Sequence, residues 1–163
     1  MNSLQILRVL KGDDLAQRYA VGVYPADRLP PVHKYPSAFV VNSDPDGMRG
    51  SHWLKPNFLT PTVYRQNYTG IILFSFLGKN SSHFVCNEVR LQSFNTTVCG
   101  QHCLFHLLHR CRNISMNKIV SVFTDDHLIN DMLVHDFIEE RYDVDVPVSD
   151  LDLICRQICV KKQ

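Results

Sequence analysis

Apolar side chains recur along the chain at two spacings, one typical of helices and one typical of strands. Steps of three and four residues predict six helices, over residues 3–11, 13–18, 99–111, 115–123, 124–141 and 150–160. Ser3, Ser115 and Thr124 are the expected N-caps of three of them, because a short side-chain oxygen can accept a bond from the first-turn N–H groups. In the longest apolar stretch, Leu104 and Leu107 should face the core.

Strand patterns fill much of the first half of the chain. The β-branched run Ser37–Asn42 is followed by a Pro-Asp-Gly turn and by His52–Leu54, which predicts a hairpin. The apolar run Gly70–Gly78 fits a buried strand, whereas residues 55–68 show no clear period. Extended segments are expected at residues 22–31 and 143–148. Together these elements predict one α+β domain over residues 1–163.

Composition excludes several classes of protein. The 163 residues carry a formal net charge of +1, so no nucleic-acid footprint is evident. No apolar run approaches the roughly 20 residues that span a bilayer, and the N-terminus does not resemble a signal peptide. We therefore expect no membrane partner and an intracellular location, in the cytoplasm or nucleus. The six cysteines are then expected to be reduced thiols.

Cys99 stands where a polar, β-branched run gives way to the longest apolar helix pattern. At the first turn of a helix, unpaired N–H groups and the positive end of the dipole favour a thiolate over a thiol. Gly100 removes a side chain beside the sulfur, so that a backbone or a substrate can come close. This arrangement suits a nucleophile. The alternative is a buried, inert cysteine, a common role for a free thiol.

A nucleophilic thiol needs a base and a donor for the developing oxyanion. His52 is the best-placed base, since it follows a turn and Trp53 can shield one side of it from water. Gln92 lies seven residues before Cys99, so its amide can fold back towards the sulfur as the donor. Taken singly, His52 could be a packing residue and Gln92 a surface glutamine.

These residues in this order resemble one family. Gly50-Ser51-His52-Trp53, followed by Gln92-x₆-Cys99-Gly100-x-x-Cys103, resembles the adenain-like cysteine proteases, a group with the adenovirus endopeptidase and proteases of large DNA transposons. The group belongs with the ubiquitin-like-protein proteases. The resemblance runs from about residue 22 to about Cys159. It implies a papain-like fold, in which a central helix carrying Cys99 packs on a small mixed or antiparallel sheet.

The resemblance also implies roles for single residues. Cys99 would be the nucleophile, His52 the base and Gln92 the oxyanion donor. Trp53 and Gly100 would support the oxyanion site. The substrate would be a protein or peptide, such as a viral- or transposon-type structural protein or a ubiquitin-like tail. We expect a monomer that needs no cofactor and no metal.

The acid that orients the histidine in this family is missing. The best counterpart of its motif is Leu73–Gly78, which contains no carboxylate, and no Asp or Glu occurs between Asp46 and Glu88. Asn67 is an alternative orienting group. Read one nucleotide later, with permitted codons, Ile72–Ser82 can spell Tyr-Tyr-Phe-His-Ser-Leu-Gly-Lys-Thr-Pro-Pro, which resembles the missing motif. One hypothesis is therefore that residues 55–85 are degenerate or frame-shifted, which the coding DNA would test.

Two other classes of function compete with a protease. Cys99, Cys103 and His106 share one helical face and are residue types that zinc accepts, which would make this a metal site. Alternatively, the chain is a catalytically impaired protease that binds a peptide or a ubiquitin-like protein without cleaving it. The missing acid favours this second alternative, whereas the presence of Cys99, His52 and Gln92 together favours an enzyme.

Overall fold

Helices and a small sheet make up the fold, which is α+β as the sequence predicts. The computed structural model describes residues 1–19, 22–31, 37–48, 53–58, 61–64, 79, 85–86 and 89–144. Predicted elements at residues 70–78, 145–148 and 150–160 lie outside the described residues. Within the described residues, no helix is long and apolar enough to span a bilayer.

The sheet has five described strands, which lie side by side in chain order. They are β1 (Gly22–Pro25), β2 (Phe39–Asn42), β3 (Trp53–Phe58), β4 (Pro61–Tyr64) and β5 (Val85–Cys86). The two outer pairs, β1 with β2 and β4 with β5, are parallel, whereas β3 runs antiparallel to both neighbours. The sheet is therefore mixed.

The predicted hairpin is confirmed over its described part, because Val41 pairs with Leu54 and Asn42 with Trp53. His52, the first residue of the predicted return strand, lies outside the described residues. In the segment without a clear period, the described residues 55–58 and 61–64 form an antiparallel pair, in which Lys55 of β3 pairs with Tyr64 of β4. Pro56 lies inside β3, which explains why the strand is hard to recognise: proline is rare in paired strands.

Five described helices accompany the sheet. They are α1 (Ser3–Gly12), α2 (Asp14–Arg18), α4 (Cys99–Cys111), α5 (Met116–Val120) and α6 (His127–Glu139).

The helix caps differ from the prediction in two places. Ser115 caps α5 as expected. The predicted caps Ser3 and Thr124 are wrong, because Asn2 caps α1 and Asp126 caps α6. Thr124 instead accepts a hydrogen bond from the Asp126 N–H (3.2 Å) and so stabilises the turn before the helix.

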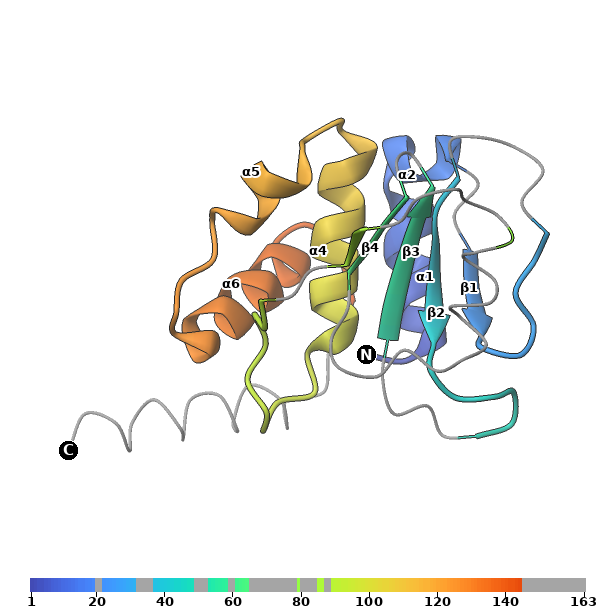
Figure 1. The fold of residues 1–163 in the computed structure, drawn as a ribbon, viewed down its shortest axis with the longest axis horizontal. Helices are drawn as coiled ribbons and strands as arrows, with labels where there is room; N and C mark the ends of the chain where they lie inside the picture. The colour runs from blue at the N-terminus through green and yellow to red at the C-terminus, as the bar shows by residue number, and fades with distance from the viewer. Residues whose placement is uncertain are drawn as a thin grey trace.

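Helix α4 is the centre of the fold and lies between the sheet and the pair α5 and α6 (Figure 1). Its leucines are buried as the spacing predicts: Leu104, Leu107 and Leu108 have no exposed surface. They share one core with residues of α1, β2 and α6, namely Ile6, Val9, Val40 and Ile138. This core fixes the position of Cys99, the first residue of α4.

Asp13 ties the N-terminal helices to the end of α4. Its side chain caps α2 by accepting the N–H of Ala16 (2.8 Å), and it also accepts from Arg112 Nη2 (2.6 Å) and the Tyr142 hydroxyl (2.8 Å). Burial of Asp13 would raise the pKa of its carboxyl group, but these three bonds outweigh burial and hold the pKa below its usual range.

Replacing Asp13 with Ala should lower the free energy of unfolding by about 2–3 kcal/mol at pH 7, because a helix cap and a bond to a charged partner are lost. Since the folded pKa is depressed, this stabilisation is fully present above the unfolded value of about 4 and is lost as the pH falls through the folded value. Urea unfolding at pH 7 and pH 3 measures the difference. Asp14→Ala, an exposed neighbour, should change the stability by less than about 0.5 kcal/mol; equal losses in both variants would contradict the assignment.

Candidate active site

Cys99 occupies the position that the sequence predicts, at the first residue of α4. The preceding residue, Val98, is the N-cap, and no side chain makes a capping hydrogen bond there. The other four described helices begin at a side chain that accepts a first-turn N–H. The N–H groups of this first turn therefore remain available for an anion, as a thiolate or an oxyanion requires.

Trp53, at the start of β3, contacts both thiols of the first two turns of α4. Its backbone lowers the pKa of the Cys99 thiol. Its carbonyl oxygen accepts from the Cys103 Sγ at 3.2 Å. The indole Nε1 donates to the Met1 carbonyl oxygen at 3.0 Å, which fixes the ring as well. One residue of the sheet is thus bound to the helix that carries the candidate nucleophile.

Gly100 permits this close approach. A Cβ atom at Gly100 would lie 3.3 Å from Trp53 Cδ1 and 3.1 Å from the Met1 Cβ, which is tighter than ordinary carbon contacts. A side chain here would push β3 and the N-terminal segment away from the helix. Gly100 therefore allows the Trp53 ring to lie directly against the first turn of α4.

The electrostatics of Cys99 differ from the simple expectation for a helix N-terminus. Burial raises the pKa of the Cys99 thiol, and the backbone N–H groups of Trp53 and Gly100 oppose burial only in part. Burial therefore outweighs the stabilisation that the helix end gives the thiolate, and the pKa of Cys99 lies above its ordinary value rather than below it. The positively charged N-terminus also lowers this pKa without reversing the effect of burial.

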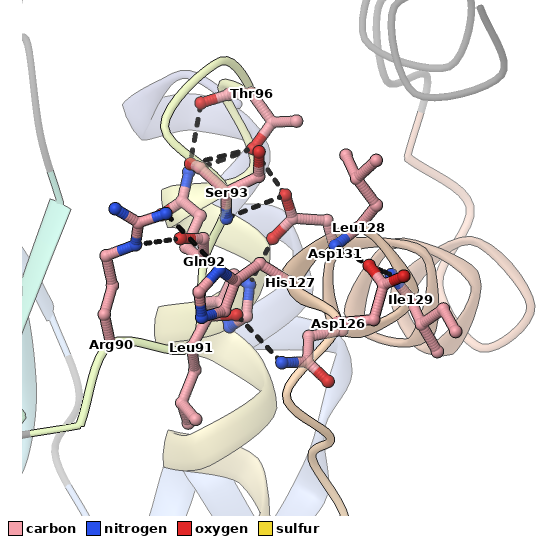
Figure 2. A network of polar contacts seen from close by, with 12 residues as sticks. Arg90, Leu91, Gln92, Ser93, Thr96, Asp126, His127, Leu128, Ile129 and Asp131 are labelled. Carbon is pink, nitrogen blue, oxygen red and sulfur yellow. Dashed lines mark hydrogen bonds and ion pairs between the residues drawn. The ribbon is translucent and has the colours of Figure 1, made fainter. Parts of the chain in front are cut away.

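Gln92 is buried in the loop that leads into α4. Its Nε2 donates to the carbonyl oxygen of Thr96 at 3.0 Å (Figure 2). The alternative of a surface glutamine is therefore wrong.

Helix α6 holds the same loop through Asp131. This carboxylate has no exposed surface and accepts three hydrogen bonds, from the Thr96 hydroxyl (2.6 Å), the Ser93 N–H (3.2 Å) and His102 Nε2 (2.8 Å). Figure 2 shows Asp131 turned towards Ser93 and Thr96. The loop before the candidate nucleophile is thus fixed to a second helix.

Sequence reasoning missed Asp131 and its partners. One signal was present, because Asp131 falls on the stripe formed by Leu128, Val134 and Ile138, all of which are buried. A carboxylate on such a stripe is rarely buried without a partner. The sequence does not indicate which residue is the partner of Asp131, because Thr96 lies 35 residues away in the chain.

Two residues of the predicted site, His52 and Phe74, lie outside the described residues. Phe74 belongs to the counterpart of the acid motif. The zinc alternative gains no support, because no three His, Cys, Asp or Glu side chains converge on one point in the part of the chain that the structure describes. His106, one of the suggested ligands, directs its Nδ1 to the carbonyl oxygen of His102 at 2.8 Å.

No protein-family model matches the chain, and no curated protein matches it significantly.

The raised pKa of Cys99 predicts a specific pH dependence. In a His52→Ala variant the thiol should titrate in the surroundings described above, so its alkylation by iodoacetamide should still be increasing above pH 8.5, where an exposed cysteine begins to level off. Mass spectrometry of the Cys99 peptide at a series of pH values measures this rate. A rate that levels off below about pH 8 would contradict the assigned balance between burial and the backbone N–H groups.

Proposed function

We propose that this chain is a cysteine endopeptidase of the adenain type with a papain-related fold. The observation that carries the proposal is the contact of Trp53 with the first two turns of α4, where its carbonyl oxygen accepts from Cys103 Sγ at 3.2 Å and its ring lies against Gly100, next to Cys99. In the sequence, Trp53 directly follows His52, the base that the resemblance implies. A thiol, the sheet residue next to a histidine and an uncapped helix end therefore meet at one place.

The proposed reaction is acyl transfer to a thiol. His52 removes the proton from Cys99, the sulfur attacks the peptide carbonyl carbon, and the carbonyl oxygen gains negative charge. Gln92 and the Cys99 backbone N–H stabilise that oxyanion, with the Trp53 N–H as a further donor. His52 then gives the proton to the leaving amine, and water hydrolyses the acyl-enzyme with the same histidine as base.

The raised pKa of Cys99 makes His52 essential to this mechanism. A protonated imidazole beside the sulfur would stabilise the thiolate and so offset the effect of burial. Alkylation of the parent protein should therefore level off at a lower pH than alkylation of the His52→Ala variant.

By resemblance, the substrates are structural proteins of a viral or transposon type, or ubiquitin-like tails. We propose that the enzyme acts inside the cell as a monomer without a cofactor. A specific observation supports the second candidate, a protein that binds such segments without cleaving them: burial raises the Cys99 pKa, and no Asp or Glu occurs between Asp46 and Glu88 to orient His52. If residues 55–85 are frame-shifted, the coding DNA will show one insertion or deletion that restores the acid motif.

Cleavage of a peptide library separates the two functions. We expect weak but measurable cleavage by the parent, and we expect Cys99→Ala to abolish it because the nucleophile is lost. Cys111→Ala is the matched control: it removes a buried thiol at the other end of α4 and should retain activity. Absence of cleavage by the parent, or equal cleavage by parent and Cys99→Ala, would reject the protease and favour the binding protein.

Restoring the acid should increase activity. Phe74→Asp would place a carboxylate in the counterpart of the family motif, where it can orient His52 and stabilise its charged form. We expect kcat to rise by roughly 10- to 1000-fold, which corresponds to about 1.4–4 kcal/mol. Steady-state kinetics with the best library peptide measures the gain, and circular dichroism checks that the variant is folded. A folded variant with unchanged kcat would show that the segment does not supply the acid.

A further inference from the structure

The buried carboxylate of Asp131 sets the direction of the Thr96 hydroxyl group. A hydroxyl has one hydrogen, and a carboxylate can only accept, so the 2.6 Å bond directs the Thr96 hydrogen towards Asp131 rather than towards the Ser93 carbonyl oxygen, which lies 3.5 Å away. The lone pairs of the hydroxyl oxygen are left for other donors. Gln92 Nε2 lies 3.4 Å from this oxygen and 3.0 Å from the carbonyl oxygen of the same residue.

Two acceptors on Thr96 therefore face the amide of Gln92. Only the NH₂ side of an amide can donate to them, so the amide must present its nitrogen to Thr96. Among the described residues, the Gln92 Oε1 on the other side is buried and has no hydrogen-bond partner. The NH₂ group has two hydrogens; we assign one of them to the two Thr96 acceptors together, as a three-centre bond, which leaves the other for an oxyanion.

Helix α6 also holds the backbone on both sides of Gln92. Asn130 Nδ2 donates to the carbonyl oxygen of Leu91 at 3.0 Å, and the Ser93 N–H donates to Asp131. Arg90 lies beside His127 of the same helix (3.3 Å) and donates through Nε to the carbonyl oxygen of Gln92 at 2.9 Å. The close-up in Figure 2 shows this run of contacts along α6.

We propose that Asp131 is a positioning residue for the oxyanion donor and acts on Gln92 through the Thr96 hydroxyl. The inference rests on the proposed protease function, since it assigns a purpose to the orientation of the Gln92 amide. Asp131 itself does not touch the substrate. It fixes which end of an amide faces the reacting carbonyl.

Thr96 offers the sharpest test, because it can be changed without touching Asp131 or Gln92. Thr96→Val removes the hydroxyl and keeps the branched shape, while Asp131 retains Ser93 and His102 as partners. Loss of a complete oxyanion donor lowers kcat by about 10²–10³-fold, so a misoriented donor should lower it by about 10- to 100-fold with KM nearly unchanged. Thr96→Ser keeps the hydroxyl and should restore kcat to within about threefold of the parent.

A double-mutant cycle separates positioning from a general loss of structure. In a Gln92→Ala background the donor is already absent, so adding Thr96→Val should not lower kcat further. The inference is overturned if Thr96→Val lowers kcat equally in both backgrounds, or if it leaves kcat of the parent unchanged.

An activity-independent measurement tests the same inference. The side-chain amide protons of Gln92, identified by their absence in Gln92→Ala, should exchange slowly with water in the parent and in Thr96→Ser, and much faster in Thr96→Val. Equal exchange in parent and Thr96→Val overturns the positioning role even in a protein that cleaves nothing. Conversely, loss of protection in Thr96→Val together with no cleavage by the parent rejects the protease function alone.

Discussion

Helix α4 is enclosed by other elements along almost its whole length, and the rest of the structure depends on this enclosure. From Gly100 to Leu108 every residue of the helix is buried. Apolar burial contributes about 25 cal/mol per Å², which favours such a position for the leucines. The same enclosure buries Gln101, His102 and His106, whose polar atoms each cost about 1–3 kcal/mol when no partner replaces water.

That cost explains the polar contacts around α4. His102 is bonded to Asp131, and His106 to the carbonyl oxygen one turn earlier. Both imidazoles also stack against Phe123, with ring centroids 5.7 and 5.4 Å away. Enclosure acts on the candidate nucleophile too. Cys99 itself is partly exposed, yet burial of its surroundings raises the pKa of its thiol, against the effect of the helix end.

The parts of this fold that sequence reasoning predicted are those with a local cause. The bounds of α4 follow from the Cys99-Gly100 boundary and from the spacing of its leucines, which are physical properties of adjacent residues. The caps of α1 and α6 were misplaced because good capping residues stand one or two positions apart there, and only the backbone angles choose between them. The pairing of β3 with β4 was missed because Pro56 disguises the strand.

The site shows the same division. The position of Cys99 at a helix start follows from neighbouring residues, whereas the crowding at Gly100 comes from Met1 and Trp53, and the bond from Cys103 to Trp53 joins residues 50 positions apart along the chain. The role of Asp131 depends on a helix and a loop that meet only after folding. Its burial on an apolar stripe is the one feature that the sequence displays.

The choice of a carboxylate at position 131 is informative in itself. Apolar side chains would join α6 to the loop at least as well, since replacing buried charged groups by well-packed apolar ones is often neutral or stabilising. An apolar contact, however, has no direction and cannot decide where the Thr96 hydroxyl points its hydrogen. A buried acceptor can, and it leaves the hydroxyl oxygen of Thr96 to accept from the amide nitrogen of Gln92. Asp131 is therefore needed to orient the Thr96 hydroxyl rather than to hold α6 against the loop.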